Sequence, residues 1–203
     1  MKPGPGAGPT TFHLVRHATH GLLPHTLAGR MPGVPLSPEG QAQAAALAER
    51  FGQGQPIAAI VASPVQRAQE TARPIAARLG LPLRTDPGFD EIDFGRWTGR
   101  RFDDLQPDPA WHAWNRLRSL ARCPGGETMH VAQSRALLAL SRLRAEYGSA
   151  SIVVVSHADV LKAMLAPALG LSLDHLHRIT IDPASVSTLV LFDEDCRVDG
   201  LNR

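Results

Sequence analysis

Two arginines and two histidines lie just beyond apolar runs that are typical of buried strands. They are Arg16, His17, Arg67 and His157. A guanidinium group binds phosphates and carboxylates through paired hydrogen bonds, and an imidazole acts as a nucleophile or a proton carrier near neutral pH. No carboxylate immediately adjoins these four side chains in the sequence. They therefore predict an electropositive site suited to a dianion such as phosphate.

Each of these side chains, taken alone, has an ordinary structural interpretation. An Arg-His pair after a strand is often a polar loop, and His157 alone would fit a core or capping histidine. Arg67 alone would fit a solvated helix face, but a cation in the first turn opposes the helix dipole at a cost of ~0.3 to 1 kcal/mol. A bound anion explains that position better, so the coincidence at three strand ends favours a site.

The strands that must position these residues alternate with segments of helical period, which is typical of an α/β fold with a mostly parallel sheet. In such a sheet ligands bind beyond the carboxyl ends of the strands. The predicted strands are Phe12–Val15, Ile57–Ala62, Ser151–Val155 and Val186–Phe192, with weaker ones at Pro82–Thr85 and Arg178–Ile181.

Helices between the strands predict a three-layer α/β/α architecture. One begins after Ser37-Pro38, with a buried stripe at Ala44, Leu47, Ala48 and Phe51. A second follows Ala62, with Ser63 as the N-cap and Pro64 in the first position. Two more are predicted at Thr128–Tyr147 and from about Ala158.

The domain boundaries follow from composition. Residues 1–10, with three Pro and three Gly, predict a flexible N-terminal tail without a signal peptide, and residues 11–203 predict one domain. The stretch 87–128 contains all three Trp and no clear strand, so we interpret it as a lid inserted over the sheet. Between positions 96 and 122 it has six Arg against three acids, which is a local basic patch.

Bulk properties exclude several classes of protein. A net charge of +2 predicts no nucleic-acid or membrane-surface partner, and no apolar stretch approaches the roughly 20 residues that a membrane span needs. Cys123 and Cys196 are too few for a disulfide framework, which favours a reduced, cytoplasmic setting. Edge strands in this fold class can pair, which allows a homodimer.

Ordered motifs over roughly residues 11–192 resemble the histidine phosphatase superfamily, also called the phosphoglycerate mutase-like family, and in particular its phosphatase branch. The matching motifs are Leu14-Val15-Arg16-His17-Ala18, Gly29-Arg30 before Leu36-Ser37-Pro38-Glu39-Gly40, Ser63-Pro64-Val65-Gln66-Arg67-Ala68-Gln69-Glu70-Thr71-Ala72, Glu91-Ile92-Asp93-Phe94-Gly95-Arg96-Trp97-Thr98-Gly99, Pro124-Gly125-Gly126-Glu127 and Val155-Ser156-His157.

This resemblance implies a phosphomonoesterase for small phosphorylated metabolites that works through a phosphohistidine on His17. Arg16, Arg67 and His157 would bind the phosphoryl oxygens, without a metal ion or other cofactor. Glu91 would be the general acid and then the general base, with Asp90 and Asp93 as rival candidates.

Three positions depart from the usual motifs. Ala18 stands where glycine is common, and His20 where threonine or serine is usual. No Asn occurs in the segment after His20, where many members use one to contact phosphate, so His20 or His25 is a candidate substitute. Asp159 stands where a glycine is common after the second histidine and places a carboxylate near the predicted pocket.

Three alternative functions remain open from the sequence. A phosphoglycerate mutase would return the phosphoryl group to a second hydroxyl, but the chain is short for a mutase and lacks its Glu-Arg-His-Tyr-Gly run. A catalytically inactive phospho-ligand binding module would keep the same residues. A metalloenzyme is suggested by the nine His and by the pair His175-x-His177, but that pair has no third ligand at helical spacing.

Overall fold

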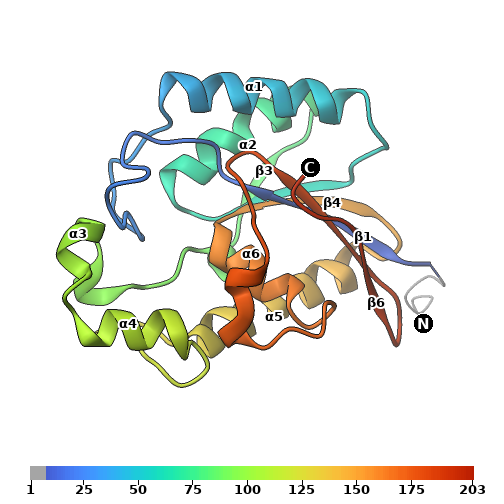
Figure 1. Ribbon diagram of the computed structural model, residues 1–203. Helices are drawn as coiled ribbons and strands as arrows, with labels where there is room; N and C mark the ends of the chain where they lie inside the picture. The colour runs from blue at the N-terminus through green and yellow to red at the C-terminus, as the bar shows by residue number, and fades with distance from the viewer. Residues whose placement is uncertain (1–7) are drawn as a thin grey trace.

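The computed structural model describes residues 8–203, and a six-stranded sheet lies at its centre (Figure 1). The predicted tail falls mostly on residues 1–7, outside the described part of the chain. Its boundary needs a correction, because Thr10 is already the buried first residue of strand β1 (Thr10–Arg16).

The sheet order is β3-β2-β4-β1-β5-β6. Strands β1, β2 (Ala59–Ala62), β3 (Leu83–Thr85) and β4 (Ser151–Ser156) run parallel, whereas β5 (Val186–Leu191) is antiparallel to β1 and β6 (Cys196–Gly200) is antiparallel to β5. The mostly parallel α/β architecture predicted from the sequence is therefore confirmed.

The carboxyl ends of β1, β2 and β4 meet at one edge of the sheet. In the register of the parallel pairs, Arg16 lies opposite Ser156 and Ala62 opposite Val155. The backbone N–H of His17 donates to the Ser156 carbonyl at 2.9 Å, and that of Ser63 to the Val155 carbonyl at 2.9 Å. The residues that follow these three strands are thus brought together by the ladder itself.

Helices cover both faces of the sheet, as Figure 1 shows. Alternate residues of each buried strand face opposite ways, so β4 sends Val153 and Val155 to one core and Ile152 and Val154 to the other. Helices α1 (Pro38–Gly52) and α2 (Gln66–Leu79) pack on the first face. Helices α5 (Met129–Tyr147) and α6 (Ala158–Leu165) pack on the second.

The start of α2 differs from the prediction. Val65, not Ser63, is the N-cap, and the helix begins at Gln66. The Ser63 hydroxyl accepts a hydrogen bond from the Val65 N–H at 3.2 Å and lies beside His157, so Ser63 belongs to the turn that precedes the helix. The predicted stripe of α1 is confirmed, since Ala44, Leu47, Ala48 and Phe51 are all buried.

The stretch 87–128 is short helices joined by turns. These are the 3-10 turns η1 (Pro87–Phe89) and η2 (Gly95–Trp97) and the helices α3 (Phe102–Leu105) and α4 (Pro109–Arg116). In Figure 1, α3 and α4 lie on the side of α5 and α6. The ring of Trp97 packs edge-on against the rings of Trp111 and Trp114. Trp97 and Trp114 are buried in the same hydrophobic core as the inner face of α5, so this stretch is packed against the body of the fold.

Two strand predictions near the C-terminus were wrong or incomplete. Residues 178–181 form no strand: Arg178 ends the 3-10 helix η3 (Leu173–Arg178), and Ile181 is buried with its carbonyl turned to Arg16. Strand β6 was not predicted, because its alternating polar pattern lies at the sheet edge. In the described part of the chain, no helix is long and apolar enough to cross a membrane.

Candidate active site

His17 lies directly after β1 with its ring orientation set by one short contact. Its Nδ1 lies 2.9 Å from the backbone oxygen of Ala18. A carbonyl oxygen only accepts, so Nδ1 carries the proton and the lone pair is on Nε2. The ring is therefore held in the tautomer that a nucleophilic imidazole requires.

The backbone that carries His17 is itself held on two sides. The Ala18 N–H donates to the Thr71 hydroxyl of α2 at 2.9 Å, and that hydroxyl donates to the Arg67 carbonyl at 2.7 Å. On the other side, a Cβ on Gly40 of α1 would lie 2.0 Å from the Thr19 oxygen, so only glycine allows this approach. Ala18 has no unusual backbone: among the described non-glycine residues, positive φ occurs only at Ala184 and Asn202.

Burial keeps His17 neutral. The residue is 3% exposed. Burial, followed by the charge of Arg67, holds the pKa of the His17 imidazole well below its ordinary value, and the bond to Ala18 offsets only part of this effect. At neutral pH the Nε2 lone pair is thus available for attack on an electrophile.

Arg67 and Arg16 present buried donors without acceptors. Arg67 is 1% exposed, and its Nη2 donates to the Gly29 carbonyl at 2.9 Å. Its Nε and Nη1, like Nε of Arg16, have no hydrogen-bond partner among residues 8–203. Arg16 is anchored through Nη1 to the Ile181 carbonyl at 2.7 Å. Buried N–H groups without acceptors are costly, and a phosphoryl dianion would supply those acceptors.

His157 lies between Arg67 and Ser63, and its ring centroid is 5.1 Å from that of His17. Its Nδ1 is 3.0 Å from Arg67 Nη2, and its Nε2 is 2.9 Å from the Ser63 hydroxyl oxygen. Since arginine only donates, Nδ1 accepts and the proton is on Nε2, directed to Ser63. Burial is the main cause that holds the pKa of the His157 imidazole well below its ordinary value, and the positive charge of Arg67 is the next.

Glu91 is the carboxylate that reaches this cluster. Its Oε2 lies 3.5 Å from Arg67 Nη2 and 3.4 Å from His157 Nδ1. Burial raises the pKa of Glu91 to about 7, although Arg67 and the Ile92 N–H oppose the shift. A carboxyl group with a pKa near 7 can both give and take a proton at neutral pH.

The two rival carboxylates are bound by neighbouring groups. Asp90 Oδ1 accepts from the Glu91 N–H at 2.8 Å and from the Ser63 hydroxyl at 3.3 Å, and its Oδ2 lies 3.3 Å from Arg30 Nε. Asp93 Oδ1 accepts from the Gly95 N–H at 2.9 Å. The structure therefore brings Glu91, together with Arg16, Arg67, His17 and His157, to one place.

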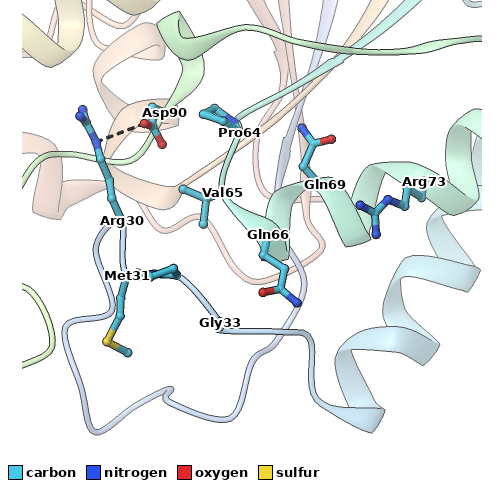
Figure 2. Close-up of a pocket in the computed structure, with 10 residues that line it drawn as sticks. Arg30, Met31, Gly33, Pro64, Val65, Gln66, Gln69, Arg73 and Asp90 are labelled. Atoms are coloured by element: carbon cyan, nitrogen blue, oxygen red, sulfur yellow. Dashed lines mark ion pairs between the residues drawn. The ribbon is translucent and has the colours of Figure 1, made fainter.

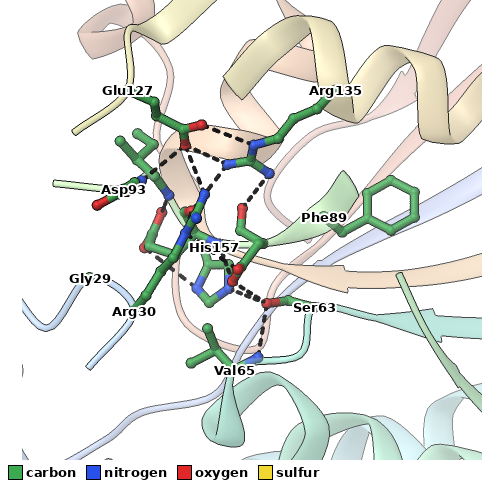
Figure 3. Close-up of polar contacts among 12 residues, drawn as sticks. Gly29, Arg30, Ser63, Val65, Phe89, Asp93, Glu127, Arg135 and His157 are labelled. Carbon is green, nitrogen blue, oxygen red and sulfur yellow. Dashed lines mark hydrogen bonds and ion pairs between the residues drawn. The ribbon is translucent and has the colours of Figure 1, made fainter. Parts of the chain in front are cut away.

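Sequence reasoning missed a network of two arginines and one carboxylate beside Glu91 (Figure 3). Arg135 of α5 donates from Nη1 to the carbonyls of Gly88 and Asp90, at 2.9 and 2.8 Å. Its Nη2 donates to the Glu91 carbonyl at 3.0 Å and to Glu127 Oε1 at 2.7 Å. This network fixes the segment that carries Glu91.

Arg30 completes the network from the opposite side. Its Nε donates to the Glu91 carbonyl at 2.7 Å, and its Nη2 to Glu127 Oε1 at 3.1 Å. Figure 3 shows the Glu127 carboxylate between the guanidinium groups of Arg30 and Arg135. Arg30 and Glu127 both stand in the motifs that carry the family resemblance, whereas nothing in the sequence pattern singles out Arg135.

Two glycines in those motifs allow two loops to touch. A Cβ on Gly126 would lie 2.1 Å from the Asp93 oxygen, and one on Gly95, at φ +53°, would lie 2.3 Å from the Pro124 oxygen. The Asp93 carbonyl accepts from the Glu127 N–H at 2.9 Å. Glycine at both positions thus brings the Glu127 carboxylate to the Glu91 segment.

The three remaining candidates have different positions. His20 is 3% exposed, and its ring centroid lies 5.3 Å from that of His17. His25 is exposed. Asp159 is paired with Arg118 Nη1 at 2.6 Å and with Lys162 Nζ at 3.8 Å. Burial alone would raise the pKa of Asp159, but these two cations lower it below its ordinary value, so the carboxylate is charged.

An open pocket of about 460 Å³ adjoins the Arg30–Asp90 ion pair (Figure 2). Loop residues 30–33, Pro64–Gln66, Gln69 and Arg73 line the rest of it. None of the five predicted site residues lines it, but its lining residues Arg30 and Asp90 contact the Glu91 carbonyl and Ser63. Within residues 8–203, no three His, Cys, Asp or Glu side chains are grouped as a metal site.

The site brings together a neutral, buried imidazole, two guanidinium groups and a carboxyl group of raised pKa at one edge of an α/β sheet. Such a set of groups can bind a phosphoryl group and transfer it to the imidazole. Residues 12–203 match the model of the histidine phosphatase superfamily (branch 1), and the chain belongs to that family.

Three proteins to which this chain is similar are phosphatases by name. It is 34% identical to glucosyl-3-phosphoglycerate phosphatase of Mycobacterium tuberculosis over 164 residues, covering 75% of this chain and 73% of that protein. It is 29% identical to phosphoserine phosphatase 1 of Hydrogenobacter thermophilus over 182 residues, covering 87% and 84%. The solved structure of the alpha-ribazole phosphatase from Shigella flexneri has a TM-score of 0.84 at 25% identity, covering 95% and 96%.

Proposed function

We propose that this protein is a metal-independent phosphomonoesterase that hydrolyses small phosphorylated metabolites through a phosphohistidine on His17. One observation carries the proposal: Arg67 Nε and Nη1 and Arg16 Nε are buried donors without partners among the described residues, close to a neutral imidazole. The family membership and the named phosphatase relatives support the same reaction class.

In the first step, His17 forms a bond to phosphorus. The Nε2 lone pair attacks the phosphoryl group, and the bond from phosphorus to the ester oxygen breaks. Glu91, protonated because its pKa is about 7, donates its proton to the departing oxygen. Arg16 and Arg67 bind the phosphoryl oxygens and offset the charge that spreads over them, and His157, which accepts from Arg67 Nη2 and donates to Ser63, holds that guanidinium group in place.

In the second step, water releases the phosphoryl group. The Glu91 carboxylate takes a proton from water, the water oxygen bonds to phosphorus, and the bond from phosphorus to Nε2 breaks. Inorganic phosphate leaves, His17 regains its lone pair and Glu91 regains its proton. The charge-stabilising groups are all side chains of this chain, so the scheme needs no metal ion.

The substrate class is a small phosphate ester. The relatives are, by their names, phosphatases of glucosyl-3-phosphoglycerate, phosphoserine and alpha-ribazole, so what their substrates have in common is a phosphate ester on a small molecule. We assign the choice among such esters to residues 87–128, which we propose act as the lid, because this stretch carries Glu91 and the basic patch.

A phosphate-release assay tests the proposal. Purified protein should hydrolyse p-nitrophenyl phosphate in EDTA at mildly acidic pH, and His17→Ala should abolish turnover. Brief exposure to substrate followed by an alkaline quench should leave an acid-labile phosphoryl group on the wild type and none on His17→Ala. Loss of activity in EDTA would contradict metal independence. Conversion of 3-phosphoglycerate to 2-phosphoglycerate with a need for 2,3-bisphosphoglycerate would instead establish a mutase.

A further inference from the structure

We propose that His20 is a further ligand of the phosphoryl group, beside Arg16 and Arg67, and donates to one of its oxygens from Nδ1. This inference rests on the proposed function, because it concerns the same site. It assigns a role to a residue that stands where the family usually has threonine or serine, in a chain that has no Asn between Arg16 and Leu36.

The first observation is an unpartnered buried atom. His20 is 3% exposed, and its Nδ1 has no hydrogen-bond partner in the described protein. A buried imidazole nitrogen without a partner costs about 1 to 3 kcal/mol, so such atoms are rare unless a ligand supplies the partner. When Nδ1 carries the proton, its missing partner is a hydrogen-bond acceptor, and a bound substrate would supply that acceptor.

The second observation is the position of the ring. The His20 centroid is 5.3 Å from the His17 centroid, at an interplanar angle of 43°. The charged groups that act on His20 are Arg67 and Arg16, which themselves have unpartnered buried donors. His20 and the two arginines whose charges act on it thus have four buried nitrogen atoms without a partner among the described residues: Arg16 Nε, Arg67 Nε, Arg67 Nη1 and His20 Nδ1.

Charge decides that His20 acts as a neutral donor. Burial, together with the charges of Arg67 and Arg16, lowers the pKa of His20 to about 4, so the ring has one N–H at neutral pH. With that proton on Nδ1, the unpartnered atom is a hydrogen-bond donor, and a phosphoryl oxygen accepts such bonds strongly.

The backbone holds His20 in this place. His20 forms an antiparallel bridge with Leu36, and its carbonyl accepts from the Leu23 N–H at 3.1 Å. The preceding residue is tied to α1, since the Thr19 N–H donates to Gln43 Oε1 at 2.9 Å. The turn that carries His20 is therefore fixed by hydrogen bonds before a ligand binds, which lowers the conformational entropy lost on binding.

Inorganic phosphate is a suitable probe, because its binding is measured without turnover. The dissociation constant is determined by calorimetry for the wild type and for His20→Asn, His20→Gln and His20→Leu. The Asn amide nitrogen occupies the place of Nδ1, whereas the Gln amide nitrogen reaches the place of Nε2. We expect His20→Leu and His20→Gln to bind phosphate about 10- to 100-fold more weakly, and His20→Asn to stay within about threefold of the wild type.

Two further measurements keep the outcome decisive. The exposed His25→Leu is the matched control and should bind phosphate like the wild type. In ¹⁵N spectra, the Nδ1 signal of His20 should take the protonated, hydrogen-bonded shift when phosphate is added. If His20→Leu does not fold, as judged by circular dichroism, the comparison of Asn with Gln still discriminates.

The results separate the two proposals. Equal phosphate affinity in wild type, His20→Leu and His20→Gln, or no phosphate binding by the wild type, would overturn the role of His20. The wild type could bind phosphate through His20 and yet form no phosphohistidine. That result would support the role of His20 and refute the proposed hydrolysis.

Discussion

Arg135 and Glu91 are joined by a hydrogen bond from Arg135 Nη2 to the Glu91 backbone oxygen, at 3.0 Å, although they are 44 residues apart in the chain. The same guanidinium group binds the carbonyls of Gly88 and Asp90. One side chain of α5 thus binds three backbone carbonyls of the loop that carries Glu91, including the carbonyl of Glu91 itself. We therefore expect Arg135 to act as a positioning residue for Glu91.

We predict that Arg135→Lys lowers kcat/KM for p-nitrophenyl phosphate about 10- to 100-fold. Lysine keeps the charge but loses the fork that binds several carbonyls, and a displacement of about 1 Å at a reacting group costs up to about 100-fold in rate. The loss should lie mainly in kcat. Arg142→Lys is the matched control, because Arg142 is also on α5 but binds the Asp86 carboxylate at the surface. Equal losses in both variants would show a general effect on α5.

The pH dependence of turnover should follow Glu91. Its pKa is raised to about 7, so the protonated acid is available below pH 7 and is lost above it. We predict that kcat/KM falls about tenfold per pH unit above about pH 7. In Glu91→Gln the residual activity should be low and should lack this decline. Glu49→Gln, at an exposed position of α1, should keep the wild-type profile.

Glu91 should also make stability depend on pH. The unfolded carboxyl ionises near pH 4.5 and the folded one near 7, so the free energy of unfolding falls as pH rises between these values. The Glu91→Gln substitution removes this pH-dependent loss of stability, because glutamine does not ionise. We predict that it is more stable than wild type by up to about 3 kcal/mol at pH 8 and similar at pH 4, measured by urea denaturation. A difference independent of pH would contradict a raised pKa at Glu91.

Ser63 should matter more for turnover than for stability. Its hydroxyl oxygen is the partner of His157 Nε2, at 2.9 Å. Ser63→Ala leaves that buried N–H unpaired, so we predict about 10-fold lower kcat/KM as His157 loses its tautomer and orientation. Ser187→Ala removes another buried hydroxyl, which accepts from the Asn202 N–H at 3.1 Å, and should lower the melting temperature without changing kcat/KM.

The local pattern of apolar and polar residues was sufficient to predict most strands of the sheet and the position of several candidate site residues. The apolar runs of β1 and β4 and the stripe of α1 are periodic features that any window of the sequence reveals. Because parallel strands end at the same edge, the residues after β1, β2 and β4 could be placed together before any contact was known. His17, Arg67 and His157 were predicted to lie at one edge on this ground, and their catalytic roles stay proposals.

Only the tertiary structure decided which side chains complete the site. Asp90, Glu91 and Asp93 are near neighbours in a loop without periodicity, and contacts with Arg67 and His157 from other elements single out Glu91. Ser63 has the sequence features of an N-cap, yet its hydroxyl lies against His157. Arg135 lies on a helix whose pattern shows only its buried face. Sequence determines strands and helices through short-range periodicity, whereas burial, pKa and hydrogen-bond partners depend on contacts between residues far apart in the chain.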